Sequence, residues 1–79
     1  MKNIKADVFM DLRGVACPMN YVKAKLQIEE MKLGQTMLLY IDEGEPIRLV
    51  PVSLQDDGQE ILKIEKMEEF YKLLMRKAV

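Results

Sequence analysis

The stretch "DLRGVACPMN", residues 11–20, joins a predicted strand to a predicted helix and contains the only cysteine of the chain. Before it, apolar and polar residues alternate imperfectly over residues 6–12, which predicts a short strand. Gly14 then permits a backbone turn that a residue with a Cβ would resist. Because proline is tolerated best at the first position of a helix, Pro18 predicts a helix start and places Cys17 at the N-cap.

The position predicted for Cys17 favours a reactive thiol. The free N–H groups and the dipole give the start of a helix a partial positive charge, which stabilises a thiolate. Cys17 is therefore a candidate nucleophile or sulfur carrier. A buried cysteine with a structural role is the alternative that the residues alone leave open.

The composition indicates one small domain over residues 1–79, near the lower size limit at which an apolar core suffices. Hydrophobic residues make up 49% of the chain and charged residues 32%, which is ordinary for a folded protein. One cysteine and no histidine exclude an internal disulfide, a Cys–His dyad within the chain, and a metal site built on thiolate and imidazole. We therefore expect no metal.

The sequence also bears on location and on partners. The N-terminal "MKNIKADVF" lacks the apolar run of a signal peptide, and no segment approaches the roughly 20 apolar residues of a membrane span. We expect a cytoplasmic protein with no membrane partner. A net charge of −1 gives no general attraction to polyphosphate, so we expect no nucleic acid partner either.

A helix is predicted over residues 18–33, with Gly34 just beyond its end. Four apolar residues at helical spacing form its predicted core side: Tyr21, Ala24, Ile28 and Met31. Three more apolar residues interrupt its polar side: Met19, Val22 and Leu26. This second set either packs under a loop, consists of isolated exposed residues, or docks a partner protein.

The next segments are a strand and an interrupted helix. Residues 35–42 form an apolar run that predicts a central strand. Because Pro51 would break a helix, we expect a helical turn over residues 46–50 and a short helix over residues 51–55 that closes at Gly58. Arg48 in this segment is either solvated surface or holds an anion near Cys17.

The last segment, residues 59–79, has an ambiguous pattern. Its apolar spacing and its Glu, Lys, Leu and Met content favour a helix. Alternation over parts of it also fits two strands joined near Glu68 and Glu69. Two strands alone would form only a marginal sheet, which a hairpin would enlarge. The residue pattern therefore favours a helix, whereas the architecture favours a hairpin.

Residues 11–42 resemble the TusA family of small sulfur carriers, also called SirA-like, whose signature Cys-Pro-x-Pro opens the first helix. Several residues stand at the family's positions: Asp11, Gly14, Cys17, Pro18, Gly34, Arg48 and Pro51. The segment "FYKLLMRK" looks like the family's terminal strand. The resemblance implies a two-layer α/β sandwich in the order βαβαββ, with a four-stranded mixed sheet, two helices on one face, and a hairpin at the end of the chain.

The resemblance also implies a sulfurtransferase that acts as a persulfide carrier and needs no cofactor. Cys17 would accept sulfane sulfur from a donor protein such as a cysteine desulfurase or rhodanese and pass it to the thiol of an acceptor sulfur-carrier protein. Asp11, Gly14, Pro18 and Asn20 would form the supporting turn and the helix start.

One position departs from the signature. Asn20 replaces the second proline, so that the motif reads "CPMN". Asn is compatible with a first helical turn, where Asn20 either hydrogen-bonds near the sulfur or caps a backbone group. Ala16 is uncharged where relatives often carry a basic side chain, which removes one possible stabiliser of the thiolate.

The sequence leaves two other functions open. One is a non-catalytic regulatory or protein-interaction module that uses Met19, Val22 and Leu26 to bind a protein. The other is RNA binding, by analogy with a similar fold in a translation initiation factor domain, and it rests on fold alone.

Overall fold

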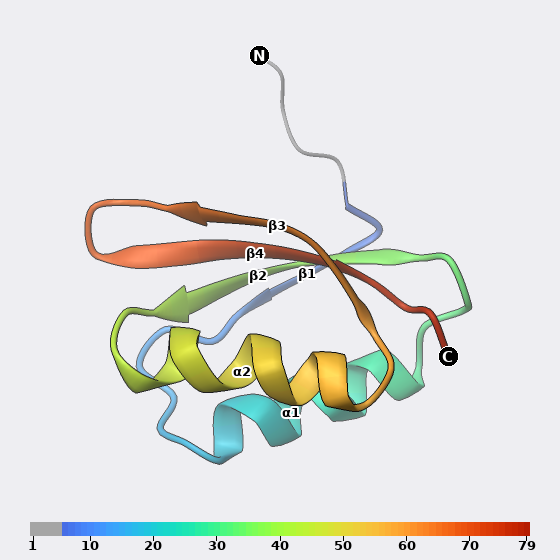
Figure 1. Cartoon of the computed structure of the whole chain (residues 1–79), viewed down its shortest axis with the longest axis horizontal. Coiled ribbons are helices and arrows are strands. Elements are labelled where there is room, and N and C mark those ends of the chain that lie inside the picture. Colours follow the sequence, from blue (N-terminus) through green and yellow to red (C-terminus); the bar gives the residue numbers. More distant parts are fainter. Residues whose placement is uncertain (1–5) are drawn as a thin grey trace.

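A four-stranded sheet and two helices form two layers in the computed structural model, which describes residues 6–79 (Figure 1). In chain order the elements are β1 (Val8–Asp11), α1 (Met19–Glu29), β2 (Thr36–Asp42), α2 (Glu45–Asp56), β3 (Glu60–Lys66) and β4 (Phe70–Arg76). This is the predicted order βαβαββ.

The sheet is mixed, with the strand order β1-β2-β4-β3. β1 and β2 are parallel, while β4 is antiparallel to both β2 and β3. Both helices cover the same face of the sheet (Figure 1). The predicted two-layer α/β sandwich is confirmed.

The core lies between the sheet and the helices. Alternate residues of β2 point into it, so that Met37, Leu39 and Ile41 are fully buried. Facing residues from the other elements complete it: Leu12, Ala24, Ile28, Met31, Val50, Leu54, Leu73 and Met75. β2 is thus the central strand that its apolar run predicted.

The hairpin at the end of the chain is also confirmed. β4 pairs with β2 along all seven of its residues, which places Leu73 beside Leu39 and Met75 beside Met37. Among residues 6–79, β3 pairs only with β4, and it is mostly exposed. The local pattern fits both a helix and a hairpin, and the pairing of β4 with β2 favours the hairpin.

The prediction that α1 continues to residue 33 is wrong, because the helix ends at Glu29 and its C-cap is Glu30. There the backbone tightens, with the N–H of Met31 donating to the carbonyl of Ile28 at 3.0 Å. Lys77 Nζ donates to the carbonyl oxygen of Met31 at 2.8 Å. The early end brings Met31 into the core and ties the chain to the C-terminal segment.

The prediction that Pro51 divides the second helical segment is also wrong. α2 is continuous, with Pro51 buried in its interior and Pro46 in its first turn. An interior proline costs about 3 kcal/mol in lost hydrogen bonding and crowding. Burial of Val50 and Leu54 on the same helix offsets that cost, since a fully buried aliphatic side chain contributes about 1.5–3 kcal/mol. Gly58, the residue predicted to close this segment, follows the C-cap of α2 with φ +95°.

Within residues 6–79, neither helix has the length and apolar character needed to cross a membrane. The expectation of no signal peptide rests on residues 1–9, of which residues 1–5 lie outside the described part of the chain.

Candidate functional site

Cys17 lies in the loop between β1 and α1 and is exposed. This loop is at the end of the molecule where β1 and β2 finish and where both helices begin (Figure 1). The right-handed crossover between two parallel strands places a helix start next to the carboxyl ends of the strands. The position of Cys17 therefore follows from the βαβ unit.

The helix start differs from its prediction by one residue. Pro18, not Cys17, is the N-cap, and α1 begins at Met19. The physical reason is that the carbonyl of Pro18 accepts the N–H of Val22 at 3.0 Å, whereas the N–H of Tyr21, four residues after Cys17, donates to the side chain of Asn20. Cys17 directly precedes the cap, so its thiol lies beside the first turn.

Asn20 is the polar neighbour of the sulfur. Its side chain is buried, with 1% exposure, and its Nδ2 donates to Cys17 Sγ at 3.3 Å. Its Oδ1 accepts the backbone N–H of Tyr21 at 2.6 Å. Both predicted alternatives hold together: Asn20 hydrogen-bonds the sulfur and caps a backbone group. Asn20, rather than the half-buried Tyr21, is the fully buried residue at the start of the core side of α1.

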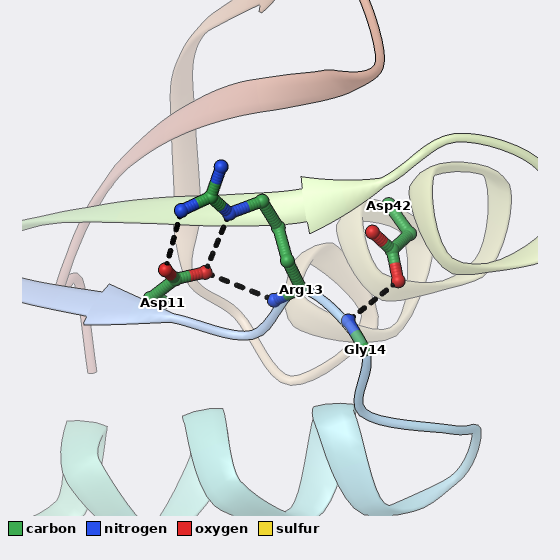
Figure 2. A network of polar contacts seen from close by, with 4 residues as sticks. All are labelled: Asp11, Arg13, Gly14 and Asp42. Atoms are coloured by element: carbon green, nitrogen blue, oxygen red, sulfur yellow. Dashed lines mark hydrogen bonds and ion pairs between the residues drawn. The ribbon is translucent and has the colours of Figure 1, made fainter.

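Two carboxylates fix the loop that leads to Cys17 (Figure 2). Asp11 accepts the backbone N–H of Arg13 at 3.0 Å and its guanidinium at 3.0 and 2.8 Å. The hydrogen bond from the Arg13 side chain holds the pKa of Asp11 below its usual value. Asp42, at the end of β2, accepts the N–H of Gly14 at 2.7 Å. Gly14 adopts φ +80°, the turn that its lack of a Cβ permits.

Arg13 also joins the loop to the sheet. Its guanidinium lies over the rings of Tyr40 at 5.0 Å and Phe70 at 4.7 Å, distances at which cations attract aromatic faces. Sequence reasoning did not single out Arg13 or Asp42. A partial signal existed for Asp42, because it ends the predicted central strand, and the carboxyl ends of neighbouring parallel strands meet at one edge of a sheet.

A small, mainly apolar groove of about 120 Å³ opens beside Cys17. Pro18, Asn20 and Tyr21 line it on the α1 side. Residues Leu49, Val50 and Ser53 of α2 line the opposite side. Cys17 therefore lines a hollow between the two helices rather than a flat surface.

Tyr21 and Asp57 bridge the start of α1 and the end of α2. The hydroxyl of Tyr21 donates to Asp57 Oδ2, and this bond, together with partial burial, raises the pKa of Tyr21. The two residues lie 36 positions apart, and no sequence pattern links them. This contact joins Tyr21, in one wall of the groove, to the end of the helix that forms the other wall.

The remaining predicted site residues do not line the groove that contains Cys17. Arg48 is exposed on α2 and does not line the groove that contains Cys17. Met19, Val22 and Leu26 are 50%, 36% and 58% exposed along α1. We call these three residues the α1 patch. Within residues 6–79, no group of three or more Cys, Asp or Glu side chains is placed to hold a metal ion.

Comparison with known proteins places the chain in a family. The family model described as "Sulfurtransferase TusA" matches residues 8–77. A protein from Archaeoglobus fulgidus, whose given name is that of a sulfur carrier protein, is 36% identical over 96% of this chain and 88% of its own length. The sulfur carrier protein TusA of Buchnera aphidicola is 31% identical over 86% of each chain. A Thermotoga maritima protein with a sulfur-carrier name is 31% identical over 73% of each chain. The chain belongs to the TusA family of sulfurtransferases.

Proposed function

We propose that this chain is a sulfur carrier that holds sulfane sulfur as a persulfide on Cys17 and relays it to an acceptor protein thiol. The observation that carries the proposal is the exposed thiol at the start of α1, held by a buried amide donor, in a member of the TusA family. Residues 1–79 would act as one domain in this role.

The proposed chemistry is two thiol exchanges. The Cys17 thiolate attacks the terminal sulfur of a donor persulfide, and the donor cysteine leaves as a thiolate. An acceptor thiolate then attacks the sulfur held on Cys17, and the Cys17 thiolate leaves. Since the chain has no second cysteine, it cannot resolve the persulfide into an internal disulfide. Sulfur must therefore leave on another molecule, and neither exchange needs a cofactor.

The loop contacts support this role. Asp11 and Gly14 fix the backbone before the thiol, and Pro18 caps the helix after it. Such anchoring keeps an exposed sulfur in one position for two different partners. Arg48 lies outside the groove around Cys17, so we assign it no part in the transfer.

We propose protein partners on both sides of the relay, in the cytoplasm. The donor would be a cysteine desulfurase or a rhodanese, and the acceptor would be another sulfur-carrier protein. The α1 patch begins two residues after Cys17 and continues along the same helix. It offers partners an apolar contact close to the sulfur.

The direct test supplies a cysteine desulfurase with radiolabelled cysteine. Wild-type protein should gain sulfur label that survives a non-reducing gel and disappears after a reducing agent. Cys17→Ser is the matched control, because it changes one atom of an exposed side chain. An equally labelled Cys17→Ser protein would remove Cys17 from the proposal.

The exposed α1 patch supports a second candidate, a non-catalytic interaction module. Met19 and Leu26 each remain at least half exposed on the side of α1 away from the core. A module of this kind would bind its partner without the thiol. Its binding would therefore survive Cys17→Ser and fail when the patch is charged.

A further inference from the structure

The amide of Asn20 can point only one way. Its Oδ1 accepts the backbone N–H of Tyr21 at 2.6 Å, and a flipped amide would oppose that donor with a second donor. The Nδ2 group therefore faces Cys17 Sγ, at 3.3 Å. A backbone group thus fixes a hydrogen-bond donor on the sulfur.

The surroundings of Asn20 keep this donor in place. The side chain is 1% exposed, although the sulfur that it contacts is accessible. Little water competes for the amide, and a hydrogen bond to a charged acceptor is stronger where water is scarce. The proline of the family signature has no side-chain donor to offer at this position.

The donor acts differently on the two states of the proposed carrier. In the free thiolate the negative charge lies on Sγ, which the amide contacts. In the persulfide anion the charge lies on the added terminal sulfur, and Sγ is a neutral atom bonded to carbon and sulfur. The amide therefore stabilises the discharged state more than the loaded one.

We propose that Asn20 is a release-promoting residue, which speeds sulfur discharge by stabilising Cys17 as a leaving group. This inference rests on the proposed carrier function. During discharge a nucleophile forms a bond to the terminal sulfur, the bond between that sulfur and Sγ breaks, and its electron pair returns to Sγ. Thiols that are better stabilised as thiolates leave faster, so the amide lowers the barrier to this step.

The test separates chemistry from partner docking by using small reagents. Protein is loaded with sodium polysulfide, desalted, and mixed with cyanide, and thiocyanate is followed over time. The step is Cys–S–S⁻ + CN⁻ → Cys–S⁻ + SCN⁻, which balances in atoms and charge. Loss of one ordinary hydrogen bond predicts that Asn20→Ala releases sulfur about fivefold more slowly than wild type.

Two variants and a control make the result specific. Asn20→Asp retains an oxygen for the Tyr21 N–H but places a carboxylate against the sulfur, so it should release sulfur more slowly than Asn20→Ala. Gln55→Ala removes an exposed amide from α2 outside the groove that contains Cys17, so it should release sulfur at the wild-type rate. Iodoacetamide alkylation should shift to higher pH in Asn20→Ala but not in Gln55→Ala. Circular dichroism confirms that each variant is folded.

The outcomes distinguish this inference from the carrier function on which it rests. The inference is supported if both Asn20 variants release sulfur more slowly than wild type while the control does not, and if the alkylation profile of Asn20→Ala shifts. Equal release rates in wild type and both Asn20 variants, or equal slowing in Gln55→Ala, overturn it and leave the carrier function standing. Wild-type protein that takes no sulfur from polysulfide or from a desulfurase overturns the carrier function itself.

Discussion

Gly14 shows how one residue can control the position of the thiol. It adopts φ +80°, and a Cβ added there would meet nothing within 4 Å. Gly14→Ala should therefore cost only backbone strain, about 1 kcal/mol of unfolding free energy, which urea titration would measure. Because Gly14 leads to Cys17, the substitution should also change the rate at which iodoacetamide alkylates the thiol.

Gly34 provides the matched control for this prediction. It has φ +88° and an equally open position, but it lies after α1 and away from the thiol loop. Gly34→Ala should lose similar stability and leave the alkylation rate unchanged. If both variants alkylate alike, the turn at Gly14 does not position the sulfur.

At this scale the sequence predicted Cys17, Pro18 and Asn20 as neighbours, because their relation is local. The N-cap was misplaced by one residue, since the cap depends on which carbonyl accepts the first helical N–H. Asp42 was missed because its contact with Gly14 joins residues 28 positions apart. Prediction of a contact between residues so far apart in the chain requires the strand pairing, which the sequence pattern does not provide.

Among the elements, the contact between Tyr21 and Asp57 holds α1 against the end of α2. Tyr21→Phe should lower the free energy of unfolding by about 1 kcal/mol, the ordinary net value of a hydrogen bond. Tyr71→Phe is the control, because within residues 6–79 the Tyr71 hydroxyl has no side-chain hydrogen bond. Thermal unfolding should place Tyr21→Phe roughly 4–8 °C below wild type and Tyr71→Phe close to it.

The same contact predicts a pH dependence. The pKa of Tyr21 is raised in the folded protein, so the contribution of its hydroxyl is complete below the ordinary tyrosine value of about 10. It declines as the pH rises from there through the raised value. The stability difference between wild type and Tyr21→Phe should therefore shrink in alkaline buffer. A difference that stays constant up to the alkaline limit of folding would contradict this assignment.

In α1 and α2, tertiary packing overrides the local rules from which the helix ends were predicted. The break predicted at Pro51 follows a sound backbone rule, but the buried face of α2 keeps the helix continuous. The helix predicted up to residue 33 ends early because Met31 turns into the core. Propensity and periodicity located both helices, and tertiary burial set their extent.

Across the whole molecule, both helices cover one face of the sheet (Figure 1). The α1 patch is exposed along α1 and begins two residues after Cys17. If partners dock there, Leu26→Glu should reduce sulfur transfer from a desulfurase about tenfold or more while leaving cyanide release unchanged. Leu33→Glu is the control, since Leu33 is also highly exposed but lies beyond the end of α1. Equal transfer by both variants would show that partners do not dock on the α1 patch.

The architecture was predictable once the resemblance to the family was recognised. Residue pattern alone gave β1, α1 and β2, but it could not choose between a helix and a hairpin for the last segment. That choice depends on β4 pairing with β2, some 30 residues earlier in the chain. The resemblance supplied that non-local information, and the structure confirms it.

The central claim is that Cys17 carries sulfur, and the intact mass of the protein tests it most directly. After incubation with a cysteine desulfurase and cysteine, wild-type protein should gain the mass of one sulfur atom and lose it again when a thiol is added. Cys17→Ser should stay unchanged throughout. A wild-type protein that gains no sulfur, or a Cys17→Ser protein that gains as much, would contradict the account.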